Sequence, residues 1–456
     1  MDEGNGEGLL RQLSWLDATA IIIGTIIGSG IFITPGLVAR NAPSPGLILI
    51  TWIVGGILCL LGALIFAELA SFMPATGGIY VFLKEAFGPL MSFIFGWLFL
   101  LVIKPGAIAT ITTGVAIYMG ELVPLSPLGI KLAAIFIIII ISSIHYRGVR
   151  LGSNIQNFLT SLKVILILGF IVVGLTSSAA DWSLLTTGGG NGGGFNLGML
   201  SLMGVALAAV LWTYDGWADI CYMAGEVKDP GRSLPRAILL STLAVIVIYV
   251  AINIVFIITV PIEQMAISDR VAADSARTLL GSGGATLVTI AILISIMGGA
   301  NGSIMLGPRV FYQMGADGYF FRWTGRIHPK FRTPANAVVV QGVWAAVLIM
   351  GFNFEELLNY FVFTTWLFFV LSTVALFIFR KRYPDVERPY STPGYPWVPL
   401  AFIAIAAAML LNSLVQRPLE SGIGLGFAVL GIPVYFLLFR NRTVTEQRAT
   451  TTDEVQ

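Results

Sequence analysis

The stretch Gly24-Thr25-Ile26-Ile27-Gly28-Ser29-Gly30-Ile31-Phe32 decides the fold of this chain, and it lies near the middle of an apolar run from Ala18 to Val38. That run has about the 20 residues that a helix needs to cross a bilayer. Because a membrane core has no water to hydrogen-bond free amides, a continuous helix is the default there. Glycine is a poor helix former, so Gly28-Ser29-Gly30 predicts an interruption of the helix at mid-depth.

Such an interruption would leave the free N–H groups of the second half-helix facing a cavity. The positive end of the helix dipole favours an anion there, which suits the carboxylate of a substrate. A second explanation stays open from this stretch alone, because Gly24 and Gly28 also form a small-xxx-small pattern typical of close helix packing.

The composition is that of a polytopic membrane protein. Of the 456 residues, 56% are hydrophobic and only 11% are charged, which lies outside the range of soluble domains. The net charge of +2, without a basic run, gives no indication of a nucleic-acid partner. Cys59 and Cys221 lie in apolar runs, which argues against a disulfide framework. The first apolar run lacks a cleavage site, so we expect a retained span and not a signal peptide.

Hydropathy predicts about twelve spans in a lipid-embedded, all-α membrane protein. The expected ranges are 17–39, 47–71, 89–119, 129–145, 154–176, 198–224, 236–260, 284–310, 335–351, 356–379, 397–415 and 423–439. We therefore expect an N-terminal tail at 1–16, a single transmembrane domain at 17–440 and a C-terminal tail at 441–456. A Gly-rich run at 188–194 predicts a flexible loop between spans.

Lysines and arginines are unevenly distributed over the predicted loops. With the N-terminus inside, the inner segments carry nineteen of them, and the outer segments carry Arg40, Lys131, Arg270, Arg277 and Arg417. This bias follows the positive-inside rule, so we expect a multi-pass protein of the plasma (inner) membrane with both termini cytoplasmic.

The sixth predicted span carries a second interruption, at Leu211-Trp212-Thr213-Tyr214-Asp215-Gly216-Trp217-Ala218-Asp219. Spans one and six are five spans apart and run in opposite directions, as in an inverted repeat of five plus five spans. The repeats would be 17–176 and 198–379, and 397–439 would hold helices 11 and 12. Unpaired carbonyls near Trp212 to Tyr214 suit an ammonium, as the amides of Ser29 and Gly30 suit a carboxylate. Two coincidentally kinked helices are the alternative.

Two residues in the second interruption have more than one interpretation. We favour Asp215 as the N-cap of the second half of span six, and the alternative is a counter-charge for a cationic side chain or a proton. Trp212 is either apolar filling or a lid over bound substrate. Asp219 lies one turn after Asp215 and has no assigned role.

Two lysines fall inside predicted spans and need partners or a cavity. Lys163, in span five, would act as a fixed charge that neutralises carbonyls where other carriers bind sodium, or as a coupling proton site; snorkelling is the alternative. Lys104-Pro105 predicts a kink with a charge that faces the bundle. The charged loop at 225–236 would form either inner-gate ion pairs or a solvated turn.

Four motifs in order resemble the L-type amino acid transporters of the amino acid–polyamine–organocation superfamily, over a region from about 13 to 440. They are the Gly24–Phe32 stretch; Ala67-Glu68-Leu69 with Pro74 and Gly77-Gly78; Ile103-Lys104-Pro105; and Tyr214-Asp215-Gly216-Trp217 with Glu226, Pro230, Arg232, Leu234 and Pro235.

This resemblance implies a LeuT-type fold and sodium-independent exchange or facilitated transport of amino acids. It implies that amides of Ser29 and Gly30 bind the carboxylate, that Trp212 is the aromatic gate and that Lys163 takes the sodium-like position. Carbonyls of Ile26, Trp212 and Asp215 would bind the amino group. The expected substrate site is therefore Ile26, Gly28, Ser29, Gly30, Trp212, Asp215 and Gly216, with a side-chain pocket from spans three, six, eight and ten. Animal members join a heavy subunit through a cysteine between spans three and four; 120–129 has none, so we expect a prokaryotic-type carrier without that partner.

The leading interpretation is an exchanger or uniporter of neutral amino acids, and a proton-coupled symporter or a carrier of cationic amino acids comes second. A membrane enzyme is poorly supported, since His145 and His328 lie at span ends and form no metal or nucleophile cluster. We expect no catalytic, metal or cofactor site. A channel would need a continuous polar pore, and a sensor would usually carry a soluble signalling domain.

Overall fold

The structure is a computed structural model, and it describes residues 9–42, 44–120, 122–186, 197–352, 354–416 and 418–439. The predicted Gly-rich loop at 188–194 and the predicted C-terminal tail at 441–456 lie outside the described residues, as does the first half of the N-terminal tail. The described part is built from α-helices, as the hydropathy predicted, and it also contains short 3-10 and π segments.

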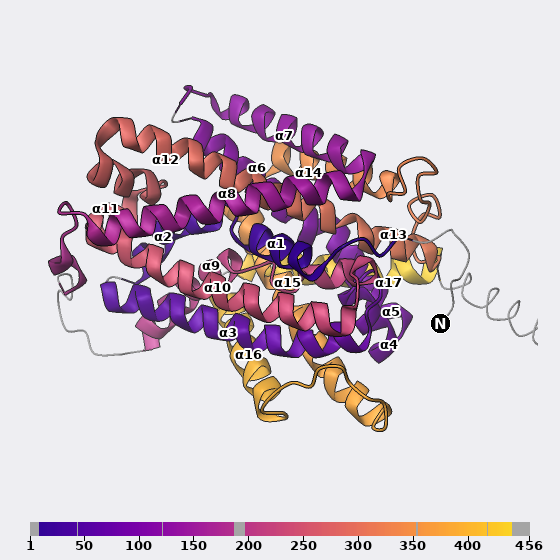
Figure 1. Cartoon of the computed structure of the whole chain (residues 1–456). Helices are drawn as coiled ribbons and strands as arrows, with labels where there is room; N and C mark the ends of the chain where they lie inside the picture. Colours follow the sequence, from indigo (N-terminus) through magenta and orange to yellow (C-terminus); the bar gives the residue numbers. More distant parts are fainter. Residues whose placement is uncertain are drawn as a thin grey trace, which may run out of the picture.

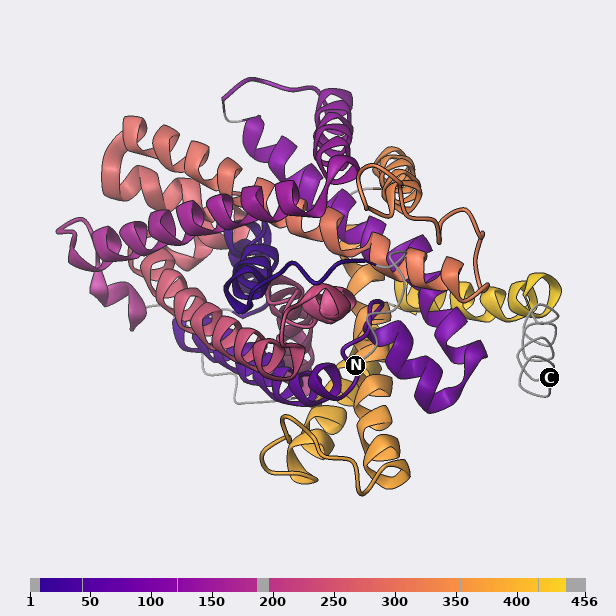
Figure 2. The same cartoon turned by 45° about the vertical axis from the view of Figure 1, so that its right-hand side comes forward.

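The helices run side by side as one elongated bundle (Figure 1). In both views α1 (Trp15–Ile26) lies in the middle, with α8 (Val149–Thr176) and α10 (Pro230–Thr259) packed against it (Figure 2). The other long helices surround this centre, and they are α3 (Pro45–Phe72), α6 (Lys104–Met119), α7 (Pro127–Arg147), α12 (Val271–Leu306), α14 (Ala335–Gly351), α15 (Phe354–Arg382), α16 (Trp397–Gln416) and α17 (Pro418–Leu438).

Shorter elements connect or extend the long helices. They are α2 (Gly30–Asn41), α4 (Ile79–Phe87), α5 (Pro89–Leu98), the π-helix η1 (Phe99–Ile103), the 3-10 helix η2 (Trp182–Leu185), α9 (Leu197–Thr213), the 3-10 helix η3 (Asp219–Glu226), α11 (Ile262–Ile267) and α13 (Pro308–Ala316).

Among the described residues, nine helices are long and apolar enough to cross a membrane. The pair α1 and α2, bent by 40° at its break, makes a tenth if it counts as one span. Two further apolar helices are shorter, Ser201–Thr213 within α9 and Ala335–Gly351. These helices all fall within predicted spans or overlap them, so the prediction of a multi-span all-α membrane protein is confirmed.

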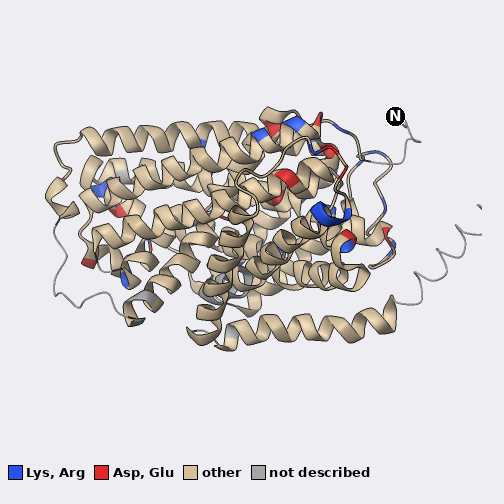
Figure 3. Ribbon diagram, turned by 90° about the horizontal axis from the view of Figure 1, so that it is seen from below, with Lys and Arg blue, Asp and Glu red and all other residues tan. Residues whose placement is uncertain are grey.

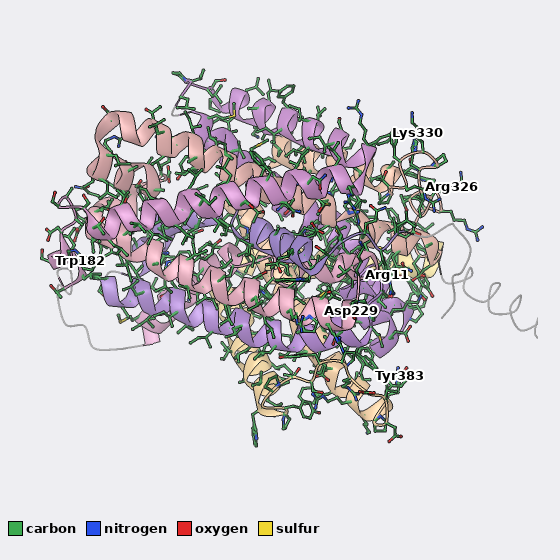
Figure 4. All side chains as sticks on the ribbon, in the orientation of Figure 1. Arg11, Trp182, Asp229, Arg326, Lys330 and Tyr383 are labelled. Atoms are coloured by element: carbon green, nitrogen blue, oxygen red, sulfur yellow. The ribbon has the colours of Figure 1, made fainter. Side chains whose placement is uncertain are left out.

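Figure 3 shows charged residues at both ends of the bundle, with most of them at one end. Arg11, Asp229, Arg326 and Lys330 lie at this end, and Trp182 lies at the opposite end (Figure 4). We call the end where Arg11 and Lys330 lie the charged end. Few charged residues lie between the two ends, and Lys104, Lys163 and Asp219, which do, are buried inside the protein, as a hydrocarbon layer requires.

Candidate functional site

Both predicted interruptions are present. α1 ends at Ile26 and α2 begins at Gly30, with Ile27 to Ser29 outside either helix. α9 ends at Thr213, a turn occupies 214–218, and η3 continues from Asp219.

The two interruptions face one small cavity of about 20 Å³, little more than one water molecule needs. Six of the seven predicted substrate-binding residues meet here, and Gly216 is not among them. The cavity is lined by Thr25, Ile26, Gly28, Ser29, Gly30, Ala107, Ile111, Trp212, Thr213, Asp215 and Ser303. Spans three, six and eight thus contribute as predicted, through α6, α9 and α12. No described side chain of α15, which holds span ten, lines this closed cavity, and the contribution of span ten to the side-chain pocket stays a prediction.

The start of α2 offers unsatisfied donors to this cavity. In the described part of the chain, the amides of Ser29, Gly30 and Ile31 make no hydrogen bond, because the chain before them is not helical. The Ser29 hydroxyl is also fully buried and has no partner. Buried donors of this kind favour an anionic or carbonyl oxygen in the cavity.

The carbonyls opposite these donors are only partly available. Ile26 O accepts from the Gly28 amide and from the Tyr249 hydroxyl, both at 2.8 Å. Trp212 O accepts from the Asp215 amide at 3.1 Å. Asp215 O makes no hydrogen bond within the described residues, which leaves it the most accessible of the three predicted ammonium acceptors.

Tyr249 is a site residue that sequence reasoning missed. Its hydroxyl on α10 lies 2.8 Å from Ile26 O and 3.1 Å from Thr213 O, so one side chain connects the carbonyl ends of both half-helices. Thr213 also donates to the Thr34 hydroxyl at 2.8 Å. A tyrosine inside an apolar run is normally interpreted as a core residue, so the sequence around Tyr249 gave no indication of this role.

The favoured N-cap role of Asp215 is wrong. The second half of span six is the 3-10 helix η3, its N-cap is Ala218, and no side chain caps it. The neighbouring Gly216 has φ +117°, and a Cβ there would lie 3.0 Å from Thr25 Cγ2 and 3.1 Å from Ile26 N. Gly216 therefore lets the two interruptions touch, because any other residue would be strained and crowded.

Trp212 lines the cavity and is only 6% exposed. Its ring therefore forms part of the wall between the half-helices, and both the lid and the filling interpretations remain compatible with this position.

Lys163 is fully buried and lies behind the first interruption. Its ammonium donates to Gly24 O at 2.9 Å and to Ile27 O at 2.6 Å. Because the helix is interrupted, these two carbonyls receive no hydrogen bond from the amides of α2. The predicted pairing with carbonyls is confirmed by this geometry, and full burial removes the snorkelling alternative.

Lys163 is one of three side chains on α8 that hold α1. Asn157 donates to the Asp17 carboxylate at 2.6 Å and Thr160 donates to Ala20 O at 3.0 Å. At Gly24 a Cβ would lie 2.2 Å from Thr160 Oγ1, so close helix packing also explains this glycine, whereas a Cβ at Gly28 would meet only Thr25 O, at 3.8 Å. α1 is thus fixed along about two turns of α8.

Lys104 and Asp219, which had no assigned partner, form a buried ion pair. The pair joins the start of α6 to the start of η3, next to the cavity. At the position of the predicted kink the backbone forms the π-helix η1, which ends directly before Lys104, and the kink itself stays a prediction. Two intramembrane charges of opposite sign were a signal for this pairing, because neither is stable there alone.

The charged end of the bundle is closed by further ion pairs. Arg309 bonds the Glu226 carboxylate at 2.8 and 3.2 Å, with both side chains 2% exposed, so the charged loop does form an internal ion pair. The N-terminal segment pairs beside it, with Leu13 N donating to Glu226 O at 3.0 Å.

A second cluster at the same end surrounds Asp317, whose carboxylate accepts from Lys84 at 2.7 Å and from Tyr80 at 2.9 Å. Burial and the Asp317 carboxylate raise the pKa of Tyr80, which keeps its hydroxyl a donor.

No group of three or more His, Cys, Asp or Glu side chains within the described ranges could hold a metal ion. His145 is buried and bonds Asn301 at 2.9 Å, and Cys59 and Cys221 are buried free thiols.

The comparisons with known proteins agree with this architecture. The amino acid permease family model matches residues 13–438. The serine/threonine exchanger SteT of Bacillus subtilis (strain 168) is 32% identical over 432 residues, which cover 94% of this chain and 97% of SteT. The b(0,+)-type amino acid transporter 1 of Mus musculus is 32% identical over 94% of this chain and 88% of its own length. The cystine/glutamate transporter of Homo sapiens is 32% identical over 94% and 85%. The chain therefore belongs to the amino acid permease family, whose members are multi-pass membrane transporters and not enzymes, and it is an amino acid transporter.

Proposed function

We propose that this chain is a sodium-independent exchanger or facilitator of neutral amino acids that works by alternating access in the plasma membrane. One observation carries the proposal: unsatisfied amides at the start of α2 and the carbonyl end of α9 face the same buried cavity. A zwitterion carries the two charges that such half-helix ends attract.

The substrate carboxylate would accept hydrogen bonds from the amides of Ser29 and Gly30, with the Ser29 hydroxyl as a further donor. The ammonium would donate to Asp215 O and Trp212 O. It would reach Ile26 O only by replacing the Tyr249 hydroxyl, which holds that carbonyl at 2.8 Å. Binding would thus break the bond through which Tyr249 connects the two half-helices.

The cavity of about 20 Å³ is too small for an amino acid, so loading requires movement of its walls. Trp212 is the proposed lid, since it lies in the wall between the half-helices. The buried Arg309–Glu226 pair keeps the charged end closed in this state, and its release would open that side.

Lys163 supports transport without sodium. A cation site between the half-helices is built from backbone carbonyls in many carriers of discontinuous-helix design. Here the ammonium of Lys163 donates to the carbonyls of Gly24 and Ile27, so it would supply the positive charge that sodium brings in such carriers.

The proposed topology has twelve spans, with repeats at 17–176 and 198–379, helices 11 and 12 at 397–439 and tails at 1–16 and 441–456. Two interruptions five spans apart support the inverted repeat. The charged end, where Arg11 lies, supports cytoplasmic termini. We propose that the carrier works without a disulfide-linked heavy subunit, since 120–129 contains no cysteine.

A second candidate is a proton-coupled symporter or a carrier of cationic amino acids. It rests on the Asp215 carboxylate, which lines the cavity and would there face a cationic substrate side chain or accept a proton.

The test is uptake of labelled neutral and cationic amino acids into liposomes that contain the purified protein. We expect uptake that depends on internal amino acid and not on sodium or a pH gradient. Uptake into empty vesicles driven by an inward proton gradient would support the symporter instead, and no uptake of any amino acid would overturn both.

A further inference from the structure

An apolar groove lies on the outside of the bundle between α7 and α14, away from the substrate cavity. Its volume is about 950 Å³. It follows α7 from Ile135 to Arg147, which is about 18 Å at the rise of an α-helix. Six of its fourteen lining residues are isoleucine or valine, and one of them, Val343, is 61% exposed.

The groove is closed at one end and open at the other. At the closed end, the ammonium of Lys131 donates to Met350 O at 2.9 Å and so bridges the two helices. At the open end lie Tyr146, Arg147 and Phe331. This end belongs to the charged end of the bundle, where Lys330 projects outward (Figure 4).

The open end presents a cation without a protein counter-charge. Arg147 is exposed and, within the described residues, makes no ion pair or hydrogen bond. Inside the groove the Ser142 hydroxyl is buried and has no partner. An apolar slot with a guanidinium at its mouth complements an acyl chain attached to a phosphate.

The walls of the groove are held in place from behind, so the slot does not depend on its occupant. On the far side of α14, Trp344 donates to Leu101 O at 2.9 Å and Gln341 donates to Ile304 O at 3.3 Å. At the mouth, Thr333 donates to Tyr146 O at 2.8 Å. The two helices pack closely at Gly342, where a Cβ would lie 3.1 Å from Ser142 Oγ.

We propose that this groove is a binding site for one anionic phospholipid, with an acyl chain between α7 and α14 and the headgroup phosphate on Arg147. Basic pockets between membrane helices on the cytoplasmic side bind anionic headgroups, and loop charges predict that side for this end. The site does not depend on the proposed transport mechanism.

The test uses the full-length purified protein and native mass spectrometry, with dioleoyl phosphatidylglycerol and dioleoyl phosphatidylcholine added in competition. We expect one retained phosphatidylglycerol and about a tenfold preference over phosphatidylcholine, since the charged contact distinguishes the headgroups. Arg147→Gln should abolish the preference while an acyl chain still binds. Ala346→Phe, which fills the groove, should abolish retention of both lipids.

Matched controls separate this site from the general lipid surface. Arg326→Gln removes an exposed cation of the same end that does not line the groove, and Val247→Phe enlarges a 68% exposed side chain on α10. Both should bind lipid as the wild type does. Unchanged phosphatidylglycerol retention in Arg147→Gln, which keeps the groove intact, would overturn the proposal. The proposal would also be overturned if the wild type showed no lipid preference and formed a dimer that Ala346→Phe dissociates. A second copy of the chain would then cover the groove.

Discussion

The ammonium of Lys163 lies between two carbonyl oxygens of the interrupted first span, 2.9 Å from Gly24 O and 2.6 Å from Ile27 O. The break in the helix deprives these carbonyls of amide donors, and the lysine replaces them. A residue on α8 thereby completes the hydrogen bonding of a half-helix that it reaches only through the tertiary fold.

Lys163→Ala should leave membrane insertion intact and reduce amino acid exchange by tenfold or more. Its removal leaves two buried carbonyls unsatisfied, at a cost of about 1–3 kcal/mol each, and the first interruption should lose its shape. Exchange in liposomes is the measurement, with size-exclusion chromatography to check folding. Lys381→Ala, at an exposed position, is the control and should behave as the wild type. Normal exchange kinetics in Lys163→Ala would remove the proposed role.

Ser29→Pro should abolish substrate binding, because it removes one of the amides that face the cavity. Ser29 has φ −75°, which proline adopts readily, so backbone strain at this residue is small. Ser29→Ala keeps the amide and removes only the unpartnered hydroxyl, so its affinity should fall much less. Substrate-induced stabilisation against heat measures both variants. Equal affinity of Ser29→Pro and the wild type would count against the site.

Gly216→Ala should greatly reduce transport, because φ +117° is unfavourable for alanine and the added Cβ meets Thr25 and Ile26. The two interruptions would be pushed apart. Gly169→Ala, in a helical position with open space around it, is the matched control and should be neutral or slightly stabilising. Full transport by Gly216→Ala would show that the contact between the interruptions is dispensable.

Breaking the buried Lys104–Asp219 pair from either side should destabilise the protein by about 3–5 kcal/mol, since one charge is left uncompensated. Lys104→Met combined with Asp219→Leu should recover most of that loss, because no buried charge remains. Thermal unfolding in detergent of the two single variants and the double variant measures the coupling. Additive losses would mean that the two residues do not depend on each other.

The sequence by itself determined that the chain is an all-helical membrane protein and where its helices are interrupted. Both results follow from local physics: an apolar run of membrane length must be helical, and Gly-Ser-Gly or Asp-Gly within it weakens the helix at that point. The same reasoning identified Lys163 as a residue that needs buried partners, since a charge in a span is costly wherever it packs.

Only the tertiary structure decided which groups meet. Tyr249 reads as one more core aromatic until α10 packs beside α1 and its hydroxyl reaches Ile26 O. Asp219 had no assigned role from the sequence, and the structure places it beside Lys104. Asp215 does not cap a helix, because a turn and a 3-10 helix follow the break. Local propensity shows where a backbone lacks hydrogen bonds, whereas the partner that satisfies it is brought from a distant segment by packing, which local sequence does not encode.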